Sequence, residues 1–186
     1  MQVRPTDVAG VVVIEPQVHA DHRGFFLETY QKQRYRAAGI HGDFVQDNHS
    51  KSRRNTLRGL HYQLPRPQGK LLWVVYGEVY DVVVDLRQDS PTFGRWTGVT
   101  LSASNRHQVF APPGMAHGFC VLSDVAEVVY KCTEYYHPEQ EHVLRWDDEE
   151  LAIEWPTQTP IVSDRDGNGL AFRDARYYDP TTIPWH

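Results

Sequence analysis

The sequence predicts an all-β protein, a β-sandwich or barrel with a few short helices. Short apolar segments recur along the 186-residue chain, and turn residues separate them at intervals of about ten positions. Helical patterns are few and short, so crossover helices of the kind that parallel sheets need are not expected. The length fits one domain. We expect that domain to span residues 1–186, with a C-terminal extension from about residue 170.

Apolar, β-branched and aromatic residues mark the expected strands. In chain order these are Val11–Ile14, Phe25–Thr29, Phe44–Ser50, Leu57–Leu64, Leu71–Tyr76, Val79–Leu86, Gln108–Ala111, Ala116–Leu122 and Val125–Tyr136. The tight Gly77-Glu78 step between the fifth and sixth of these predicts a hairpin. Pro112-Pro113-Gly114 predicts a turn, and His137-Pro138 is expected to end the last strand.

Two segments have helical character. Tyr30–Ala38 can form about two turns, and Gly39 supplies a stop signal. Asp147–Leu151 can form one more turn. The tail from Arg173 to His186 is rich in Pro and Tyr, and we expect it to wrap the protein surface or a partner subunit.

Charge and composition exclude several classes of function. Lys and Arg total 19 against 24 Asp and Glu, giving a net charge of −5, which does not suggest affinity for nucleic acid or anionic lipid. No apolar run approaches the roughly 20 residues that cross a bilayer, and the first residues lack a signal-peptide pattern. Cys120 and Cys132 are then expected to be reduced thiols. We therefore expect a cytoplasmic protein that binds neither nucleic acid nor membrane.

Several strands place polar side chains where an ordinary sandwich would have a dry core. In Val125–Tyr136 the small and apolar parity, expected to face inward, carries Tyr130. Gln46, Asn48 and Ser50 share one parity of another strand. For Leu57–Leu64 strict alternation allows two faces, one with Arg58, Leu60, Tyr62 and Leu64, the other with Leu57, Gly59, His61 and Gln63. This pattern predicts a barrel that holds a polar ligand.

The histidines raise the question of a metal. A single strand histidine is usually structural, but His61 lies in the donor-rich segment TLRGLHYQ, with Arg58 and Gln63 close in sequence. Metal-binding jelly rolls use an HxH pair, a nearby Glu and a later His. Here His61-Tyr62-Gln63 stands in place of the pair, so one His is missing, and no Glu lies within the first few residues after it. His117 in PPGMAHGF is in a plausible place for the last ligand. Two candidate ligands do not make a tight site, so we expect no metal and assign the histidines to proton chemistry or hydrogen bonding.

A set of motifs resembles those of the dTDP-4-dehydrorhamnose 3,5-epimerases, a family of metal-free, cupin-type jelly-roll enzymes. The matching segments are DHRGFFLE (21–28), FVQDNHSKS (44–52), LRGLHYQ (57–63), GEVYDVVVDLR (77–87), SPTFGRW (90–96), AHGF (116–119), Tyr130-Lys131, Tyr135-Tyr136, Trp155-Pro156 and SDRD (163–166). The resemblance runs from near residue 8 to near residue 166, in the family's order and spacing.

The resemblance implies a substrate, a reaction and a fold. The fold would be a cupin-type jelly roll. The substrate would be a dTDP-linked 4-keto-6-deoxyhexose, whose C4 ketone acidifies the hydrogens at C3 and C5. The family inverts both carbons of dTDP-4-dehydro-6-deoxy-D-glucose to give dTDP-4-dehydro-L-rhamnose, and it needs no cofactor.

Four residues match the family's catalytic positions. His61 corresponds to the base, and imidazole, with a reference pKa near 6.5, can accept a proton at neutral pH. Asp166 matches the carboxylate partner of that base. Tyr130 matches the acid on the opposite face of the sugar, and Lys70 matches the cation that stabilises the oxyanion at O4.

Further residues match positions that bind the nucleotide or the sugar. These are Arg23, Phe26, Glu28, Gln46, Asp47, Asn48, Ser50, Arg58, His117, Tyr136, Glu141 and Arg165. The arginines suit the pyrophosphate, and Phe26 and Tyr136 can stack on thymine. In the family the segment with Arg23 and Glu28 reaches the neighbouring subunit's site, which implies a homodimer. Gly167-Asn168-Gly169-Leu170 departs from the family's Ala- and Pro-containing continuation, next to Asp166.

Other functions remain compatible with the residues. A mono-epimerase acting at C3 or C5 alone can share the same four catalytic residues. A 3,4-ketoisomerase, a non-catalytic nucleotide-sugar-binding barrel and a metal-dependent cupin oxygenase are further alternatives. Simple binding needs neither an acid nor a base, so the presence of both His61 and Tyr130 favours an enzyme.

Overall fold

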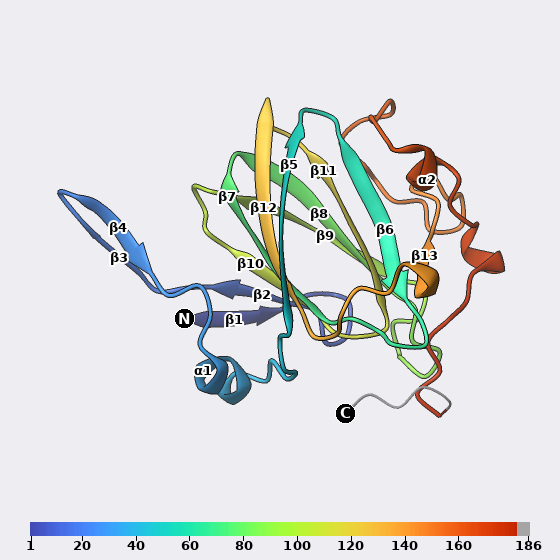
Figure 1. Ribbon diagram of the computed structural model, residues 1–186, viewed down its shortest axis with the longest axis horizontal. Helices are drawn as coiled ribbons and strands as arrows, with labels where there is room; N and C mark the ends of the chain where they lie inside the picture. The colour runs from blue at the N-terminus through green and yellow to red at the C-terminus, as the bar shows by residue number, and fades with distance from the viewer. Residues whose placement is uncertain (182–186) are drawn as a thin grey trace.

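The computed structural model describes residues 1–181, and two antiparallel sheets face each other in it (Figure 1). In spatial order the first sheet contains β1 (Gln2–Pro5), β2 (Val12–Glu15), β10 (Gln108–Ala111), β7 (Lys70–Tyr76), β12 (Val125–Cys132) and β5 (Gln46–Arg53). The second contains β13 (Glu141–Val143), β6 (Leu57–Gln63), β11 (Met115–Val121), β8 (Glu78–Asp85) and β9 (Trp96–Ser102).

From β5 to β13 the chain passes repeatedly from one sheet to the other, and only β8 and β9 are consecutive neighbours in one sheet. This connectivity is that of a double-sheet jelly roll, and it confirms the predicted fold class. It also shows that the predicted hairpin is wrong. β7 and β8 are joined at Gly77, but β7 pairs with β10 and β12, whereas β8 pairs with β9 and β11.

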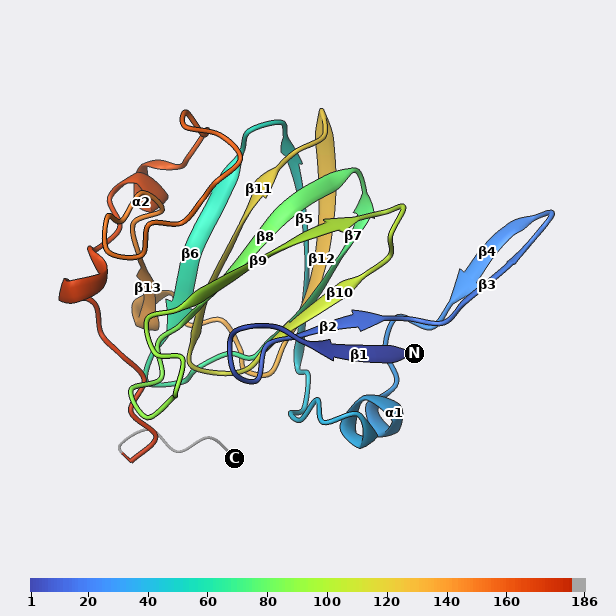
Figure 2. The ribbon, with the colours of Figure 1, turned by 180° about the vertical axis from the view of Figure 1, so that it is seen from behind.

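A separate two-stranded hairpin, β3 (Val18–Asp21) and β4 (Gly24–Leu27), projects away from the two sheets (Figures 1 and 2). Its strand β4 carries Phe25 and Phe26, which are 57% and 70% exposed. Such exposure of two neighbouring large apolar side chains is unusual on a surface that contacts only water.

Apolar side chains form three clusters. The first lies between the sheets and includes Leu72 and Val128 from one sheet and Val83 and Phe119 from the other. The second covers the outer face of the second sheet, where Trp155, Phe172 and Tyr178 of the C-terminal segment pack against it. The third lies under α1 (Lys32–Ala37), on the outer face of the first sheet. Residues 182–186 of the predicted wrapping tail lie outside the described residues.

The two segments with predicted helical character form a short helix and a single turn. α1 forms within Tyr30–Ala38 because Gln31 caps its start, its Oε1 accepting a hydrogen bond from the Arg34 amide, and Gly39 ends it at a φ of 84°. Asp147–Leu151 forms the single predicted turn and does not extend into a helix. The Asp148 carboxylate accepts hydrogen bonds from the amides of Glu150 and Leu151, and the Asp148 carbonyl accepts one from the Ala152 amide. Ala152, at a φ of 46°, ends the turn there.

Other short elements were not predicted. These are α2 (Asp164–Gly167), the 3₁₀ turns Pro138–Gln140 and Phe172–Asp174, and the strands β1, β3, β9 and β13. No helix within residues 1–181 is long and apolar enough to cross a membrane.

Candidate active site

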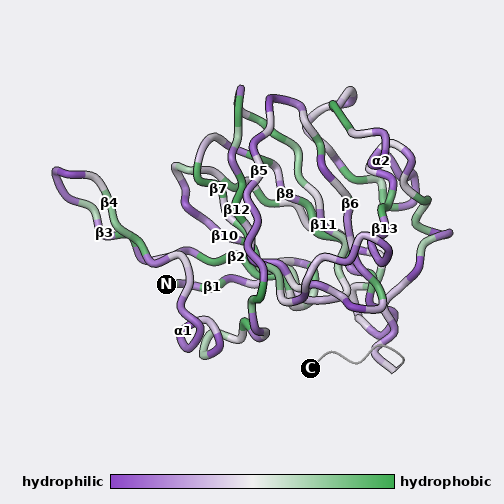
Figure 3. Tube along the Cα trace, in the orientation of Figure 1, coloured by the Kyte–Doolittle hydropathy of each residue, from purple (hydrophilic) through white to green (hydrophobic). Residues whose placement is uncertain are grey.

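Polar side chains from both sheets face inward at one region of the sandwich. β5 is coloured as hydrophilic along most of its length in Figure 3, and its partly buried residues Gln46, Asn48 and Ser50 face β12 on the inner side. Directly opposite Asn48 stands Tyr130, which packs against the inner cluster as predicted. Directly opposite Lys70 stands Cys132, and cross-strand partners of this kind share one face of a sheet. The predicted inward parities of β5 and β12 are therefore confirmed.

β6 departs from simple alternation, and this brings two functional candidates to the same face. His117 of β11 pairs with His61, whereas Phe119, two residues further, pairs with Arg58, three residues earlier on β6. The register shift places both Arg58 and His61 beside residues of the inner face. Neither of the two alternating faces considered from the sequence is correct as a whole, because both assumed an unbroken strand.

Glycines make this irregular pairing possible. Gly59 has a φ of 130°, and a Cβ built on it would lie 2.5 Å from the Gly118 Cα. Any side chain at residue 59 would overlap the backbone of β11. The amide of Gly59 also donates a 3.3 Å hydrogen bond to Asp166 Oδ2. Gly59 thus allows β6 to pack closely against β11 and also holds the Asp166 carboxylate that pairs with His61.

His61 and Asp166 form a close pair. His61 Nε2 lies 2.7 Å from Asp166 Oδ1, and the Asp166 side chain is only 6% exposed. Asp166 lies in α2, where Ser163 Oγ caps the helix by accepting a hydrogen bond from the Asp166 amide. Burial raises the pKa of Asp166, but hydrogen bonds, first among them that from His61, outweigh burial and lower it overall.

An ionised Asp166 fixes the proton of neutral His61 on Nε2. His61 Nδ1 is then an unprotonated acceptor. It lies 3.9 Å from Glu141 Oε1, and the His61 side chain is 28% exposed. This is the orientation that a general base requires: one nitrogen held by a carboxylate and the other available to a ligand.

Lys70 is buried beside the same histidine. Its Nζ donates to the His61 carbonyl oxygen at 3.4 Å. Burial lowers the pKa of Lys70, while the nearby Cys132, Glu141 and Asp81 favour its charged form. The ammonium has three N–H donors and only this one hydrogen bond among the described residues, so it can donate to a bound ligand.

Tyr130 supplies a phenol on the opposing sheet. Burial, with the negative charge of Glu141 among the lesser causes, raises the pKa of Tyr130 to about 12. Its hydroxyl therefore carries its proton at neutral pH and can donate it. A carboxylate-held imidazole, a buried ammonium and a protonated phenol together can remove a proton, stabilise the anion and return a proton.

His117 has its own carboxylate. Its Nε2 lies 2.8 Å from Asp81 Oδ2, and both side chains are almost fully buried. Burial raises the pKa of Asp81, and His117 and Lys70 oppose that effect. Asp81 was not among the predicted site residues. The signal was present, because alternation along β8 puts this single acid on the inner face between Val79 and Val83.

A second set of contacts links the segment that follows β12 to α2. Glu141 Oε2 accepts a 2.9 Å hydrogen bond from the Tyr136 hydroxyl and forms an ion pair with Arg165. Arg165 also donates to the Tyr136 hydroxyl at 3.2 Å. Gln46 Oε1 accepts from the Tyr136 amide, which ties this cluster to β5. Four of the predicted binding residues are thus brought together.

Hydrogen bonds continue along the inner side of β5. Gln46 donates to Asn48, and Asn48 donates to the Cys132 sulfur at 3.6 Å. Arg58 Nε donates to Ser52 Oγ at 3.0 Å. Ser50 Oγ is buried and makes no hydrogen bond among the described residues. A buried hydroxyl of this kind is available to a polar ligand.

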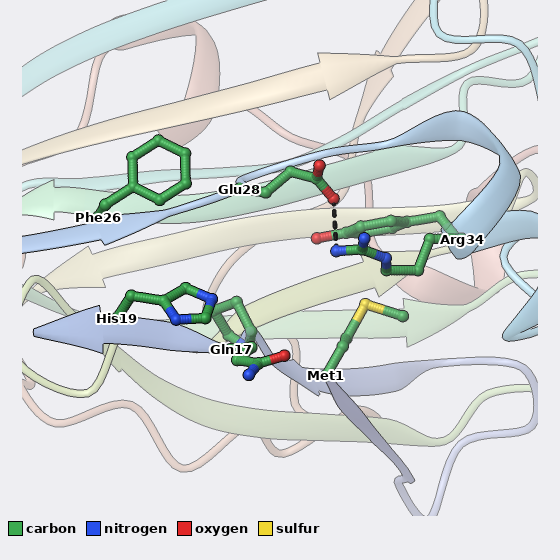
Figure 4. A pocket seen from close by; sticks show the side chains of 8 residues that line it. Met1, Gln17, His19, Phe26, Glu28 and Arg34 are labelled. Atoms are coloured by element: carbon green, nitrogen blue, oxygen red, sulfur yellow. Dashed lines mark hydrogen bonds and ion pairs between the residues drawn. The ribbon is translucent and has the colours of Figure 1, made fainter.

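The remaining predicted binding residues lie elsewhere in this chain. Asp47 is on the outer parity of β5 and forms an ion pair with Lys131. Arg23, near the hairpin tip, is ion-paired with Asp21. Phe26 and Glu28 line a different cavity, at the base of the hairpin, where Glu28 contacts Arg34 (Figure 4).

Comparisons with known proteins all indicate the same family. The family model described as dTDP-4-dehydrorhamnose 3,5-epimerase matches residues 5–174. The dTDP-4-dehydrorhamnose 3,5-epimerase of Shigella flexneri is 54% identical over 180 residues, covering 96% of this chain and 99% of that protein. The enzyme of the same name from Pseudomonas aeruginosa is 51% identical, covering 90% of this chain and 94% of that protein.

Solved structures agree. The dTDP-6-deoxy-D-glucose-3,5-epimerase of Legionella pneumophila, in complex with dTDP-4-keto-L-rhamnose, superposes with a TM-score of 0.91 at 45% identity, covering 100% of this chain and 98% of that one. A 3'-monoepimerase from Streptomyces bikiniensis, in complex with dTDP-quinovose, has a TM-score of 0.84 at 38% identity, covering 90% of this chain and 86% of that one. The chain is therefore an isomerase that belongs to the dTDP-4-dehydrorhamnose 3,5-epimerase family.

Proposed function

We propose that the protein inverts both C3 and C5 of dTDP-4-dehydro-6-deoxy-D-glucose and so forms dTDP-4-dehydro-L-rhamnose. The observation that carries the proposal is the His61–Asp166 pair at 2.7 Å, with Lys70 bonded to the His61 carbonyl and Tyr130 on the opposing sheet. Binding alone would need none of these proton donors and acceptors in such an arrangement. The similarity to 3,5-epimerases over nearly the whole chain supports the choice of substrate.

In each inversion His61 Nδ1 takes the proton from the carbon next to the C4 ketone. The C–H bonding electrons form the C=C bond of an enolate, and the negative charge moves to O4. Lys70 donates a hydrogen bond to that oxygen. Asp166 stabilises the imidazolium that has formed. Tyr130 then protonates the carbon from the other face, which reverses its configuration.

The binding residues divide between the two ends of the substrate. Arg58 and Arg165 contact the pyrophosphate, for which guanidinium groups are well suited. Gln46, Asn48, Ser50 and His117, all on the inner faces, hold the sugar. Tyr136 stacks on the thymine. The reaction runs without a cofactor or a metal, because the ketone itself stabilises the carbanion.

We further propose a homodimer. Arg23, Phe26 and Glu28 lie on or beside the hairpin, which projects away from β6, the strand that carries His61 (Figure 1). The exposed Phe25 and Phe26 would be buried if this hairpin reached the site of a second copy. Sedimentation of the purified protein should give twice the mass of 21.5 kDa. A monomer at micromolar concentration would contradict the proposal. We place the enzyme in the cytoplasm, where it acts on a soluble nucleotide sugar.

The alternative is a mono-epimerase, which the similarity to the Streptomyces bikiniensis protein keeps open. The stereochemistry of the reduced product separates the two. Incubation with the 4-keto substrate and a 4-ketoreductase, followed by NMR of the product, should give dTDP-L-rhamnose. Inversion of only one carbon would identify a mono-epimerase. Tight binding of the substrate without any change in it would indicate a nucleotide-sugar-binding protein.

A further inference from the structure

The proposed chemistry leaves the two acid–base groups in the wrong state after every inversion. His61 has gained a proton and Tyr130 has lost one. A second inversion of the same bound sugar, and every later turnover, needs a neutral His61 and a protonated Tyr130. The two side chains lie on opposing sheets and make no hydrogen bond to each other among the described residues. The proton has to pass from His61 to Tyr130 through solvent or through a third group.

Glu141 is placed for this task. Its Oε1 lies 3.9 Å from His61 Nδ1, the nitrogen that receives the substrate proton. That distance is just beyond a hydrogen bond, and such contacts commonly shorten when a ligand binds. The contacts of Glu141 also lead to the opposing sheet. Tyr136, which donates to Glu141, is hydrogen-bonded through its amide to Gln46. Gln46 in turn donates to Asn48, which stands directly opposite Tyr130. The Glu141 side chain is only 12% exposed.

The two oxygens of Glu141 have different surroundings. Oε2 accepts the hydrogen bond from the Tyr136 hydroxyl and pairs with Arg165. Oε1 makes no hydrogen bond to any of residues 1–181 and is aimed at His61. Tyr136 and Arg165 therefore hold the carboxylate in place and leave one oxygen free to exchange a proton.

We propose that Glu141 is the proton relay that restores His61 and Tyr130 between successive inversions, an inference that rests on the proposed epimerase function. The proton on His61 Nδ1 moves to Glu141 Oε1, which leaves neutral His61 and a protonated carboxyl. That carboxyl gives the proton, through one water, to the Tyr130 phenolate. Charge and atoms balance, because one proton leaves the imidazolium and one reaches the phenolate.

Reference acidities allow this order. A carboxylic acid is about two pKa units stronger than imidazolium, so the first transfer is slightly uphill, and a phenol is several units weaker than both, so the second is strongly downhill.

The test compares the first inversion with later ones. Rapid-quench measurements in D2O follow deuterium incorporation per active site in the wild type, in Glu141→Gln and in the control Glu139→Gln. Glu139 is an exposed glutamate two residues away. The measurements use saturating substrate, so that weaker binding does not enter the rates. For Glu141→Gln we expect steady turnover about tenfold or more slower than the first inversion of the same variant. Glu139→Gln should behave as wild type.

Chemical rescue gives a second readout. Glu141→Ala with added formate should recover steady turnover, whereas chloride at the same ionic strength should not restore it. Binding of dTDP to each variant shows that the site remains folded. Equal first and later rates in Glu141→Gln, or a loss confined to KM, would overturn the relay while leaving the epimerase function intact. Absence of exchange in the wild type would overturn both.

Discussion

Replacing Asp166 by Asn would remove the carboxylate that accepts the hydrogen bond from His61 Nε2 and would keep the size of the side chain. The amide can turn its NH2 toward Nε2. It would then favour the tautomer with the proton on Nδ1, the nitrogen that faces Glu141. His61 would in that case have its lone pair on the wrong side for the substrate.

The size of the loss follows from the contacts. A hydrogen bond to a charged group contributes about 1.5–3 kcal/mol, which corresponds to about 10- to 150-fold in rate. A wrong tautomer adds to this, and in the serine protease triad the equivalent change costs about 10⁴-fold. We expect kcat to fall about 10²- to 10⁴-fold. KM should change little, because Asp166 lies behind the imidazole and not against the sugar.

The assay is proton exchange at C3 and C5, followed by NMR, at several substrate concentrations. A variant within about threefold of wild type would refute the assignment of Asp166 as the partner of the base. Stability gives an independent check. The pKa of Asp166 is lower in the folded state than in the unfolded state, where it is near 3.8. The ionised carboxylate therefore stabilises the wild type at every pH above 3.8. This stabilisation is lost as the pH falls through the pKa of the folded state. Asp166→Asn should lack that pH dependence.

Three further substitutions, one of them with a matched control, test Tyr130, Lys70 and Gly59. Tyr130→Phe should lower inversion about 10²- to 10⁴-fold while exchange through His61 persists with retention, and unchanged inversion in the NMR assay would exclude Tyr130 as the acid. Lys70→Met should lower kcat about 10²- to 10³-fold and leave the melting temperature at neutral pH unchanged or higher. Burial lowers the pKa of Lys70, so the charged ammonium destabilises the fold at any pH below the pKa of the folded state. That destabilisation disappears as the pH rises toward 10.5, the value for an exposed lysine. Full activity of Lys70→Met would contradict the role of Lys70 in stabilising the oxyanion. Gly59→Ala should lower the free energy of unfolding, measured by chemical denaturation, by about 2 kcal/mol or more, because its Cβ would overlap Gly118. Gly24 has a similar φ, but a Cβ there would meet no atom within 4 Å, so Gly24→Ala should lower the free energy of unfolding by less. Equal losses for the two glycines would point to backbone conformation alone.

The inner faces of β5 and β12 could be predicted from the sequence because both strands alternate without interruption. Tyr130 and Asn48 are directly opposite each other, as their parities suggested. β6 could not be predicted in this way. Its register shift against β11 depends on the close approach of Gly59 and Gly118, which are far apart in the sequence.

The false hairpin has a similar origin. A tight turn at Gly77 is a local signal, and it does not reveal whether the following strand stays in the same sheet or crosses to the other. The carboxylate partners are also long-range. Asp166 is 105 residues from His61, and Asp81 is 36 residues from His117. Only the family resemblance pointed to Asp166. Asp81 was not predicted, although alternation along β8 places it on the inner face.

The most direct test of the proposed function uses dTDP-4-dehydro-6-deoxy-D-glucose in D2O with the wild type and His61→Ala. Proton NMR follows H3 and H5 of the sugar. The wild type should exchange both hydrogens, and His61→Ala should exchange neither, although it should still bind dTDP. Exchange by His61→Ala at the wild-type rate, or no exchange by the wild type, would contradict the proposed function.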